Sequence, residues 1–252
     1  MASTSCRRLG FLAKDSWAED GPLCALHAMN GVRVPWIVDR LAALSGRQED
    51  AATPLGGLRL LDVGCGGGIL AEPLVRLGAH VTGVDTSAAS LGEAKRRQEL
   101  FGLHNLRYLE ATPETLAARD LEDDDLFDAV VASEVVEHVA EQASFVDACL
   151  ALLRPGGSLF VTTINQTTAA RVLAIELAEG PLSIVPKGTH RWELFLSPRR
   201  LTAMVEGGGV ARVTQLHGLL YNPLTNRWSW TQSTLVNYAL HALKRSSIDA
   251  SA

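Results

Sequence analysis

Long hydrophobic runs are absent from this 252-residue sequence, and without a stretch of about 18 apolar residues it predicts no transmembrane helix. Positive charge is not in excess either. The 23 Lys and Arg against 28 Asp and Glu leave a net charge of −5, which disfavours a protein that holds nucleic acid over a wide surface. Internal repeats and low-complexity tracts are also absent. The 47% apolar content is that of a globular chain.

Cysteine is scarce, and its spacing carries no motif. The four cysteines are Cys6, Cys24, Cys65 and Cys149. Without a CxxC pair they indicate neither a zinc ribbon nor a disulfide scaffold. A reducing compartment is the simplest interpretation of this pattern.

The first 14 residues contain no acid but carry Arg7, Arg8 and Lys14. This bias is typical of an organellar transit peptide, and an ordinary frayed terminus is the alternative. We expect residues 1–50 to form an N-terminal segment with a helix over Trp36–Leu44. Residues 51–245 then form the main domain, and 246–252 a tail.

Short apolar runs alternate with amphipathic stretches between residues 58 and 163. The expected strands are Leu58–Val63, His80–Val84, Arg107–Glu110, Phe127–Ser133 and Ser158–Thr163. Helices are expected over Ile69–Leu77, Ser87–Leu100 and Glu141–Leu153. This alternation predicts an α/β fold with a doubly wound, mostly parallel sheet. Farther along, an antiparallel hairpin is expected around Asn222-Pro223.

A glycine-rich loop follows the first expected strand. Gly64, Gly66 and Gly68 let the backbone turn tightly and let a ligand approach without interference from Cβ atoms. Asp85 ends the second strand 21 residues after Gly64, where a carboxylate can accept both hydroxyls of a ribose. The acidic Asp62 before the first glycine favours a cationic cofactor without phosphate, such as S-adenosylmethionine. NAD is the alternative.

Two carboxylates and an imidazole follow the fourth expected strand. If a helix begins at Ser133, then Glu134, Glu137 and His138 share one face. Two oxygen donors and one imidazole suit a divalent ion such as Mg²⁺. His138 is otherwise a candidate general base. A third interpretation needs no metal, because acidic residues also stabilise a helix N-terminus.

Several longer strings carry a resemblance to a known family. They are LLDVGCGGGILAEPL, FDAVVASEVVEHV, LRPGGSLFVTTIN, VPKGTH and LYNPLTNRWSW. The chain resembles the coenzyme Q O-methyltransferases of ubiquinone biosynthesis, and VVASEVVEHV is most similar to the mitochondrial, animal type. The resemblance implies a class I S-adenosylmethionine-dependent fold with a seven-stranded sheet.

The same resemblance implies a set of site residues. Cofactor contacts fall on Arg33, Gly64, Asp85 and Ser133, beside Asp62 and Gly66 of the glycine loop. Mg²⁺ ligands fall on Glu134, Glu137 and His138, of which Glu137 and His138 are the expected catalytic residues. The implied reaction transfers a methyl group to a catechol-type hydroxyl of polyprenylated dihydroxybenzoate and demethylubiquinol.

Membrane contact and partners are also implied. Residues 165–187 form an apolar insert, followed by basic residues, that suits peripheral contact with an anionic membrane. The expected location is the matrix side of the mitochondrial inner membrane, in a complex with other coenzyme Q biosynthesis proteins. The family's paired-tryptophan WWD is reduced to Trp17-Ala18-Glu19, which suggests an altered or truncated N-terminus. An inactive structural subunit and a methyltransferase with another acceptor are therefore the alternatives.

Overall fold

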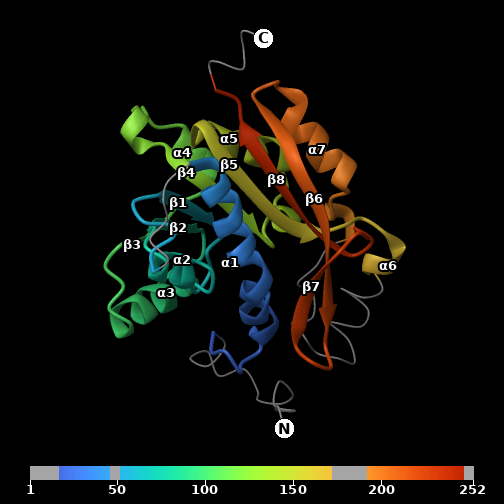
Figure 1. The fold of residues 1–252 in the computed structure, drawn as a ribbon, viewed down its shortest axis with the longest axis horizontal. Coiled ribbons are helices and arrows are strands. Elements are labelled where there is room, and N and C mark those ends of the chain that lie inside the picture. The colour runs from blue at the N-terminus through green and yellow to red at the C-terminus, as the bar shows by residue number, and fades with distance from the viewer. Residues whose placement is uncertain (1–16, 46–51, 172–191, 247–252) are drawn as a thin grey trace.

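A computed structural model describes residues 17–45, 52–171 and 192–246. Its centre is one eight-stranded sheet in the order β3-β2-β1-β4-β5-β8-β6-β7 (Figure 1). The parallel strands are β1 (Arg59–Val63), β2 (His80–Asp85), β3 (Leu106–Glu110), β4 (Phe127–Ser133) and β5 (Leu153–Ile164). The antiparallel strands are β6 (Ala211–Asn222), β7 (Arg227–Thr231) and β8 (Asn237–Lys244).

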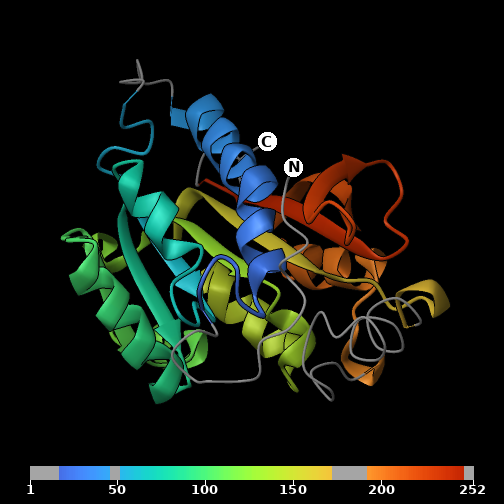
Figure 2. The same ribbon diagram turned by 90° about the horizontal axis from the view of Figure 1, so that it is seen from below.

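Helices cover both faces of the sheet (Figure 2). The helices are α1 (Cys24–Ser45), α2 (Ala71–Arg76), α3 (Ala88–Leu100), α4 (Pro113–Ala117), α5 (Gln142–Ala151), α6 (Thr168–Ala170) and α7 (Pro198–Gly207). Short 3-10 helices are η1 (Asp123–Asp125), η2 (Val136–His138) and η4 (Trp192–Leu194). One apolar cluster joins α1, α2 and α3 to the sheet, and a second joins α4, α5 and α7 to its other face.

The predicted α/β fold is confirmed, with two differences in detail. The sheet has eight strands, because β6 and β7 of the expected hairpin both join it. The expected helix over Trp36–Leu44 is part of a longer helix that begins at Cys24 and contains Pro35. The predicted boundary near residue 50 lies outside the described residues.

The strand order reverses between β1 and β4, and this predicts a ligand-binding crevice at the carboxyl ends of these two strands. The chain leaves β1 towards β2 on one side, whereas β4 pairs with β1 on the other. In doubly wound sheets the crevice at such a reversal, outside the carboxyl ends of the strands, is where ligands bind. All of β4 except its last residue is buried, as expected of a central strand covered on both faces.

The N-terminal helix is fixed to the C-terminal hairpin by two tryptophans. The Trp36 Nε1–H donates to Gln215 Oε1 at 3.0 Å, and the Trp228 Nε1–H donates to the Ala25 carbonyl at 2.9 Å. Segments about 200 residues apart in the sequence therefore lie side by side (Figure 1). Through these contacts the hairpin holds the helix that carries Arg33.

The cysteines that the structure describes differ in their pairing. Cys24 is disulfide-bonded, whereas Cys65 and Cys149 are free and buried. The spacing of the cysteines could not indicate this bond, because bridging depends on which residues approach in space.

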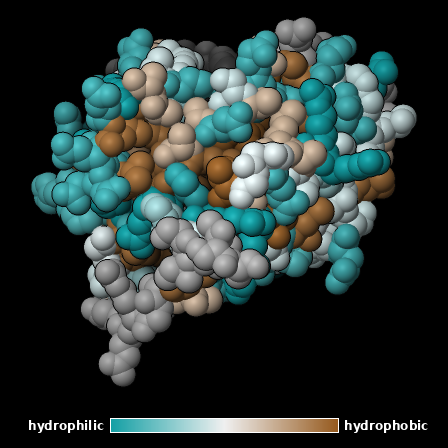
Figure 3. Space-filling view, turned by 90° about the horizontal axis from the view of Figure 1, so that it is seen from above, coloured by the Kyte–Doolittle hydropathy of each residue, from teal (hydrophilic) through white to brown (hydrophobic). Residues whose placement is uncertain are grey.

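On one face of the molecule, apolar side chains gather between polar ones (Figure 3). Within the described ranges, no helix is long and apolar enough to cross a membrane.

Candidate functional site

The glycine loop between β1 and α2 adopts the tight turn that its sequence predicts. Gly64, Gly66 and Gly68 have φ values of 67°, 52° and 84°, a region that favours glycine. The missing side chains also leave space within the protein itself, whereas the approach of a ligand to this loop stays a prediction. A Cβ on Gly66 would lie 2.8 Å from Cη2 of Trp17, and one on Gly64 would lie 2.5 Å from Val135. These glycines make room for the protein's own side chains.

Asp85, at the end of β2, holds this loop from the adjacent strand. Its Oδ2 accepts a hydrogen bond from the Gly66 N–H at 2.9 Å, and its Oδ1 accepts one from the Ser87 N–H at 2.8 Å. An ionised carboxylate has about four acceptor positions, so these two bonds leave capacity for a ligand. Asp85 is only partly buried and lines the pocket described below.

Arg33, another predicted cofactor residue, reaches from α1 to the carboxyl end of β4. It is buried, and its Nη1 donates to Ser133 Oγ at 2.7 Å while its Nε donates to Asn30 Oδ1 at 2.7 Å. Burial lowers the pKa of the Arg33 guanidinium to about 10, against the opposing charges of Asp62 and Glu134. The structure thus brings Arg33 and Ser133, 100 residues apart in the sequence, into direct contact.

Asp62 is the most unusual acid of the glycine loop. Its Oδ2 is buried without a hydrogen-bond partner. Burial raises the pKa of its carboxyl to about 7, although Arg33 acts in the opposite direction. A buried acceptor without a partner is costly and rare in native proteins, which is why it points to a ligand.

The segment after β4 differs from the expected helix. Ser133 ends the strand, Glu134 has a φ of 57°, and Val136–His138 form a single 3-10 turn. The Glu134 N–H donates to the Thr162 carbonyl at 2.9 Å, so pairing with β5 continues past the end of β4. The positive φ of Glu134 is incompatible with a right-handed helix that begins at Ser133. A non-glycine residue at this φ is strained, and such strain gathers at functional sites.

Glu134 and Glu137 nevertheless bring two carboxyl groups together. Glu137 is buried, and its Oε2 accepts from Thr163 Oγ1 at 2.7 Å. The Oε1 atoms of both glutamates are buried without a partner. The pKa of Glu137 is raised well above its ordinary value, first by burial and then by the charge of Glu134. Burial also raises the pKa of Glu134, which Thr162 and Arg33 oppose.

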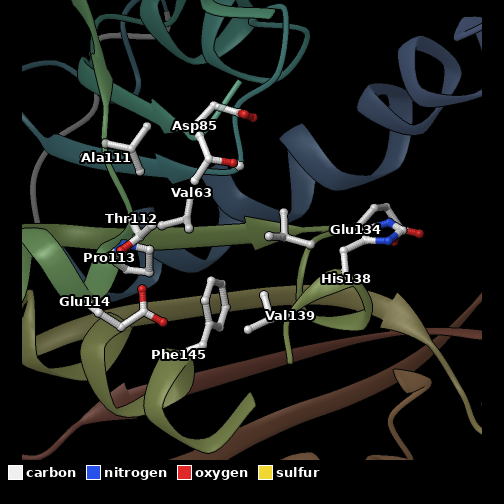
Figure 4. Close-up of a pocket in the computed structure, with 14 residues that line it drawn as sticks. Val63, Asp85, Ala111, Thr112, Pro113, Glu114, Glu134, His138, Val139 and Phe145 are labelled. Atoms are coloured by element: carbon white, nitrogen blue, oxygen red, sulfur yellow. The ribbon is translucent and has the colours of Figure 1, made fainter. Parts of the chain in front are cut away.

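These two glutamates fit a hard cation, because two unpaired oxygen atoms and mutually repelling charges are what a divalent ion would neutralise. The third expected ligand, His138, is exposed and lines the pocket beside Glu134 (Figure 4). In the part of the chain that the structure describes, no group of three or more His, Cys, Asp or Glu side chains is arranged to hold a metal. The fit therefore extends to the carboxylates alone.

A pocket of about 380 Å³ lies between these groups, within the range of roughly 300–1,000 Å³ for small-molecule sites. Glu114 lies at one end of its lining, and Glu134 with His138 at the other (Figure 4). Its lining also contains Thr112 and Pro113, which sequence reasoning missed. They lie just past the carboxyl end of β3, and Asp85 is the last residue of the neighbouring β2, so the rule that ligands bind at carboxyl ends of strands would have found them.

Comparison with known proteins places the chain in a family. Residues 61–161 match the model of a methyltransferase domain. The chain is 45% identical over 231 residues to the ubiquinone biosynthesis O-methyltransferase of Methylobacterium sp. (strain 4-46), covering 92% of this chain and 90% of that protein. The chain belongs to the ubiquinone biosynthesis O-methyltransferase family. This confirms the resemblance carried by the motifs.

The chain matches only part of the length of the mammalian members of the family. It is 44% identical over 236 residues to the mitochondrial enzyme of Rattus norvegicus, covering 92% of this chain and 67% of that protein. For the mitochondrial enzyme of Homo sapiens it is 44% identical over 235 residues, with 92% and 62% covered. The chain thus spans about two thirds of these mammalian relatives. The identities do not separate the mitochondrial from the bacterial type.

Solved structures confirm the class I methyltransferase fold of this family member. The magnesium protoporphyrin IX methyltransferase of Synechocystis PCC 6803 with bound S-adenosylhomocysteine gives a TM-score of 0.62 at 20% identity, covering 94% of this chain and 89% of that one. A methyltransferase dependent on S-adenosylmethionine from Aquifex aeolicus gives 0.58 at 15% identity, with 93% and 100% covered. At these identities the likeness concerns the fold alone.

Proposed function

We propose that this chain transfers a methyl group from S-adenosylmethionine to a catechol-type hydroxyl of polyprenylated dihydroxybenzoate and demethylubiquinol in ubiquinone biosynthesis. One observation chiefly supports this. Glu134 and Glu137 carry unpaired buried oxygen atoms at the carboxyl end of β4, where Glu134 lines the same pocket as Gly64 and Asp85. Acids that each keep one unpaired oxygen beside a nucleoside site suit an enzyme that binds a cationic donor and takes up a proton.

The cofactor is held by groups of complementary charge. Asp85 accepts hydrogen bonds from the ribose hydroxyls, beside the backbone of Gly64 and Gly66. Asp62 attracts the positive end of the cofactor, and the Arg33–Ser133 pair faces its carboxylate. NAD fits less well, because the carboxylate of Asp62 beside the glycine loop would repel its pyrophosphate.

The acceptor hydroxyl loses its proton beside His138 and Glu137. The sulfonium is already an activated donor, so the protein's task is to align oxygen, methyl and sulfur and to remove the proton. The imidazole of His138 accepts it, and Glu137 orients the acceptor. Mg²⁺ held by Glu134 and Glu137 would supply positive charge beside the acceptor oxygen.

A paired assay tests both parts. Methyl transfer from S-adenosylmethionine to a short-tailed 3-demethylubiquinol is measured with and without exhaustive chelation, in wild type and in Glu134→Gln. We expect chelation and the substitution each to remove most of the activity. Glu141→Gln, an exposed acid on the same segment, is the control and should keep it. Full activity after chelation and in Glu134→Gln overturns the metal role.

Calorimetry with S-adenosylhomocysteine separates this function from the alternatives. Binding without transfer to any quinol favours a methyltransferase with another acceptor. A folded chain that binds no S-adenosylhomocysteine favours the inactive structural subunit of a coenzyme Q biosynthesis complex. We expect binding, because the loop, Asp85 and the Arg33–Ser133 contact are all in place.

We also propose peripheral contact with the matrix side of the mitochondrial inner membrane, together with other coenzyme Q biosynthesis proteins. The mitochondrial relatives and the hydrophobicity of a polyprenyl substrate support this. The contact would involve residues 165–187, of which 172–187 lie outside the described residues. Deletion of residues 168–184 should abolish sedimentation with anionic liposomes while leaving binding of S-adenosylhomocysteine intact. Undiminished sedimentation argues against the insert as the contact.

A further inference from the structure

Trp17 lies directly on the glycine loop. A Cβ added to Gly66 would lie 2.8 Å from Cη2 and 3.0 Å from Cζ3 of its indole, and one added to Gly67 would lie against the same ring. The two glycines therefore permit the indole to rest on the backbone of the loop. A side chain at Gly66 or Gly67 would leave no room for this contact, because interatomic distances below about 3 Å force a shift.

Two donors from different helices fix the backbone of Trp17. Its carbonyl accepts a hydrogen bond from His27 Nε2 at 3.0 Å and another from Arg97 Nη1 at 3.3 Å. A carbonyl can only accept, so the Nε2 of His27 carries the proton. With α1 and α3 both holding its carbonyl, the residue is fixed in place as well as packed.

Arg97 is itself held by a two-fold ion pair with Glu72. Its Nε and Nη2 donate to the two carboxylate oxygens at 2.6 Å and 2.9 Å, and its guanidinium lies 5.4 Å from the ring centre of Phe101. Glu72 is buried in the first turn of α2, the helix that the glycine loop opens. A bidentate pair fixes the plane of the guanidinium. Arg97 thus ties the loop's own helix to the segment that lies on the loop.

The loop is held from both sides. Asp85 accepts the Gly66 N–H at 2.9 Å, while Trp17 packs against the same residue. We propose that Trp17 is a positioning residue for S-adenosylmethionine, which keeps the Gly66–Gly67 backbone in its binding conformation and is itself held by Arg97 and Glu72. The proposal rests on the proposed function. Ordering the loop before the cofactor arrives lowers the entropy cost of binding, so the effect belongs to cofactor affinity.

Calorimetric titration of the full chain with S-adenosylhomocysteine tests this. We expect Trp17→Ala to weaken binding about tenfold and Trp17→Phe, which keeps an aromatic ring, to recover most of the loss. Arg97→Met should weaken binding about fivefold, because it removes one of the two hydrogen bonds to the Trp17 carbonyl and the ion pair of Glu72. Arg96→Met is the matched control: Arg96 is the next residue on α3 and pairs with Glu93 on the surface. It should stay within about twofold of wild type.

Steady-state kinetics distinguish a role of Trp17 in positioning the cofactor from a role in stability alone. In Trp17→Ala the KM for S-adenosylmethionine should rise, while the KM for the quinol and kcat at saturating cofactor stay close to wild type. Equal rises in both KM values, or wild-type affinity in a folded Trp17→Ala chain, overturn the positioning role. Failure of the wild type to bind S-adenosylhomocysteine instead overturns the proposed function, and this inference with it.

Discussion

Two buried polar clusters lie in the same sheet and differ in how their atoms are satisfied. Around His241 in β8, Nδ1 is 2.6 Å from Thr214 Oγ1 and Nε2 is 3.1 Å from Ser158 Oγ. Its ring lies 4.7 Å from that of Phe160. At the carboxyl ends of β1 and β4, by contrast, the acids Asp62, Glu134 and Glu137 each keep one buried oxygen without a partner.

The difference separates structure from function. A buried polar atom costs free energy unless it is hydrogen-bonded, so a satisfied cluster is compatible with a role in the fold alone. An unsatisfied cluster is retained when a ligand completes it, and strongly shifted pKa values are typical of such sites. Substitutions should therefore have opposite consequences in the two clusters: loss of activity in one and loss of stability in the other.

Glu137→Gln should give the largest effect. We expect kcat to fall by about 10² or more, because the substitution removes the carboxylate that orients the acceptor. The free energy of unfolding should stay the same or rise by about 1 kcal/mol, since a buried acid with one unpaired oxygen is replaced by a neutral amide. Methyl transfer and thermal unfolding are measured together, with Glu141→Gln as the exposed control. A fall in stability without loss of activity would place Glu137 in the fold.

His241→Ala should do the reverse. Removing the ring leaves a cavity beside Phe160 and leaves the hydroxyl of the fully buried Ser158 without its partner. Both losses destabilise, and we expect the free energy of unfolding to fall by about 3 kcal/mol. The Kd for S-adenosylhomocysteine, measured well below the melting temperature, should not change. A weaker Kd in the folded variant would contradict the separation of the two clusters.

The sequence predicted the parallel half of this fold better than the antiparallel half. Strands such as β4 contain a short apolar run, here Ala129–Ala132, between turn signals, and that pattern is local. The position of β8 between β5 and β6 depends on pairing between distant segments, which no local pattern encodes. Likewise, spacing could place Glu134 and Glu137 near each other. It could not show that Glu134 pairs with the Thr162 carbonyl of β5 and takes a positive φ in place of a helical one.

The site follows the same division. Asp85 and Gly64 were predictable because strand ends and glycine loops recur locally. Arg33 came only through the family resemblance, and its contact with Ser133 joins α1 to β4. Trp17 on the glycine loop was not expected, because glycine spacing shows that room exists and not what occupies it.

A pH titration of cofactor binding probes Asp62 directly. Because the pKa of its carboxyl is raised to about 7, Asp62 is mostly neutral near pH 6 and mostly ionised near pH 8. If its carboxylate attracts the cationic cofactor, affinity for S-adenosylmethionine should rise by up to about tenfold across this interval. Calorimetry at both pH values measures the change. Asp62→Asn should bind equally weakly at both, and an unchanged slope in this variant would assign the titration to another group.

Thr214→Val should have the smallest effect and tests the satisfied cluster most finely. It removes one hydroxyl, keeps the branched shape, and leaves His241 Nδ1 without its 2.6 Å contact. We expect the free energy of unfolding to fall by about 1 kcal/mol, the net value of one hydrogen bond, because Thr214 is exposed and water can approach it. Thr225→Val, an exposed threonine in the hairpin loop, is the control for the substitution itself. Denaturant unfolding of both variants measures the difference. Equal stability in the two would mean that water replaces the hydroxyl fully, so that the His241 cluster rests on Ser158 and ring packing alone.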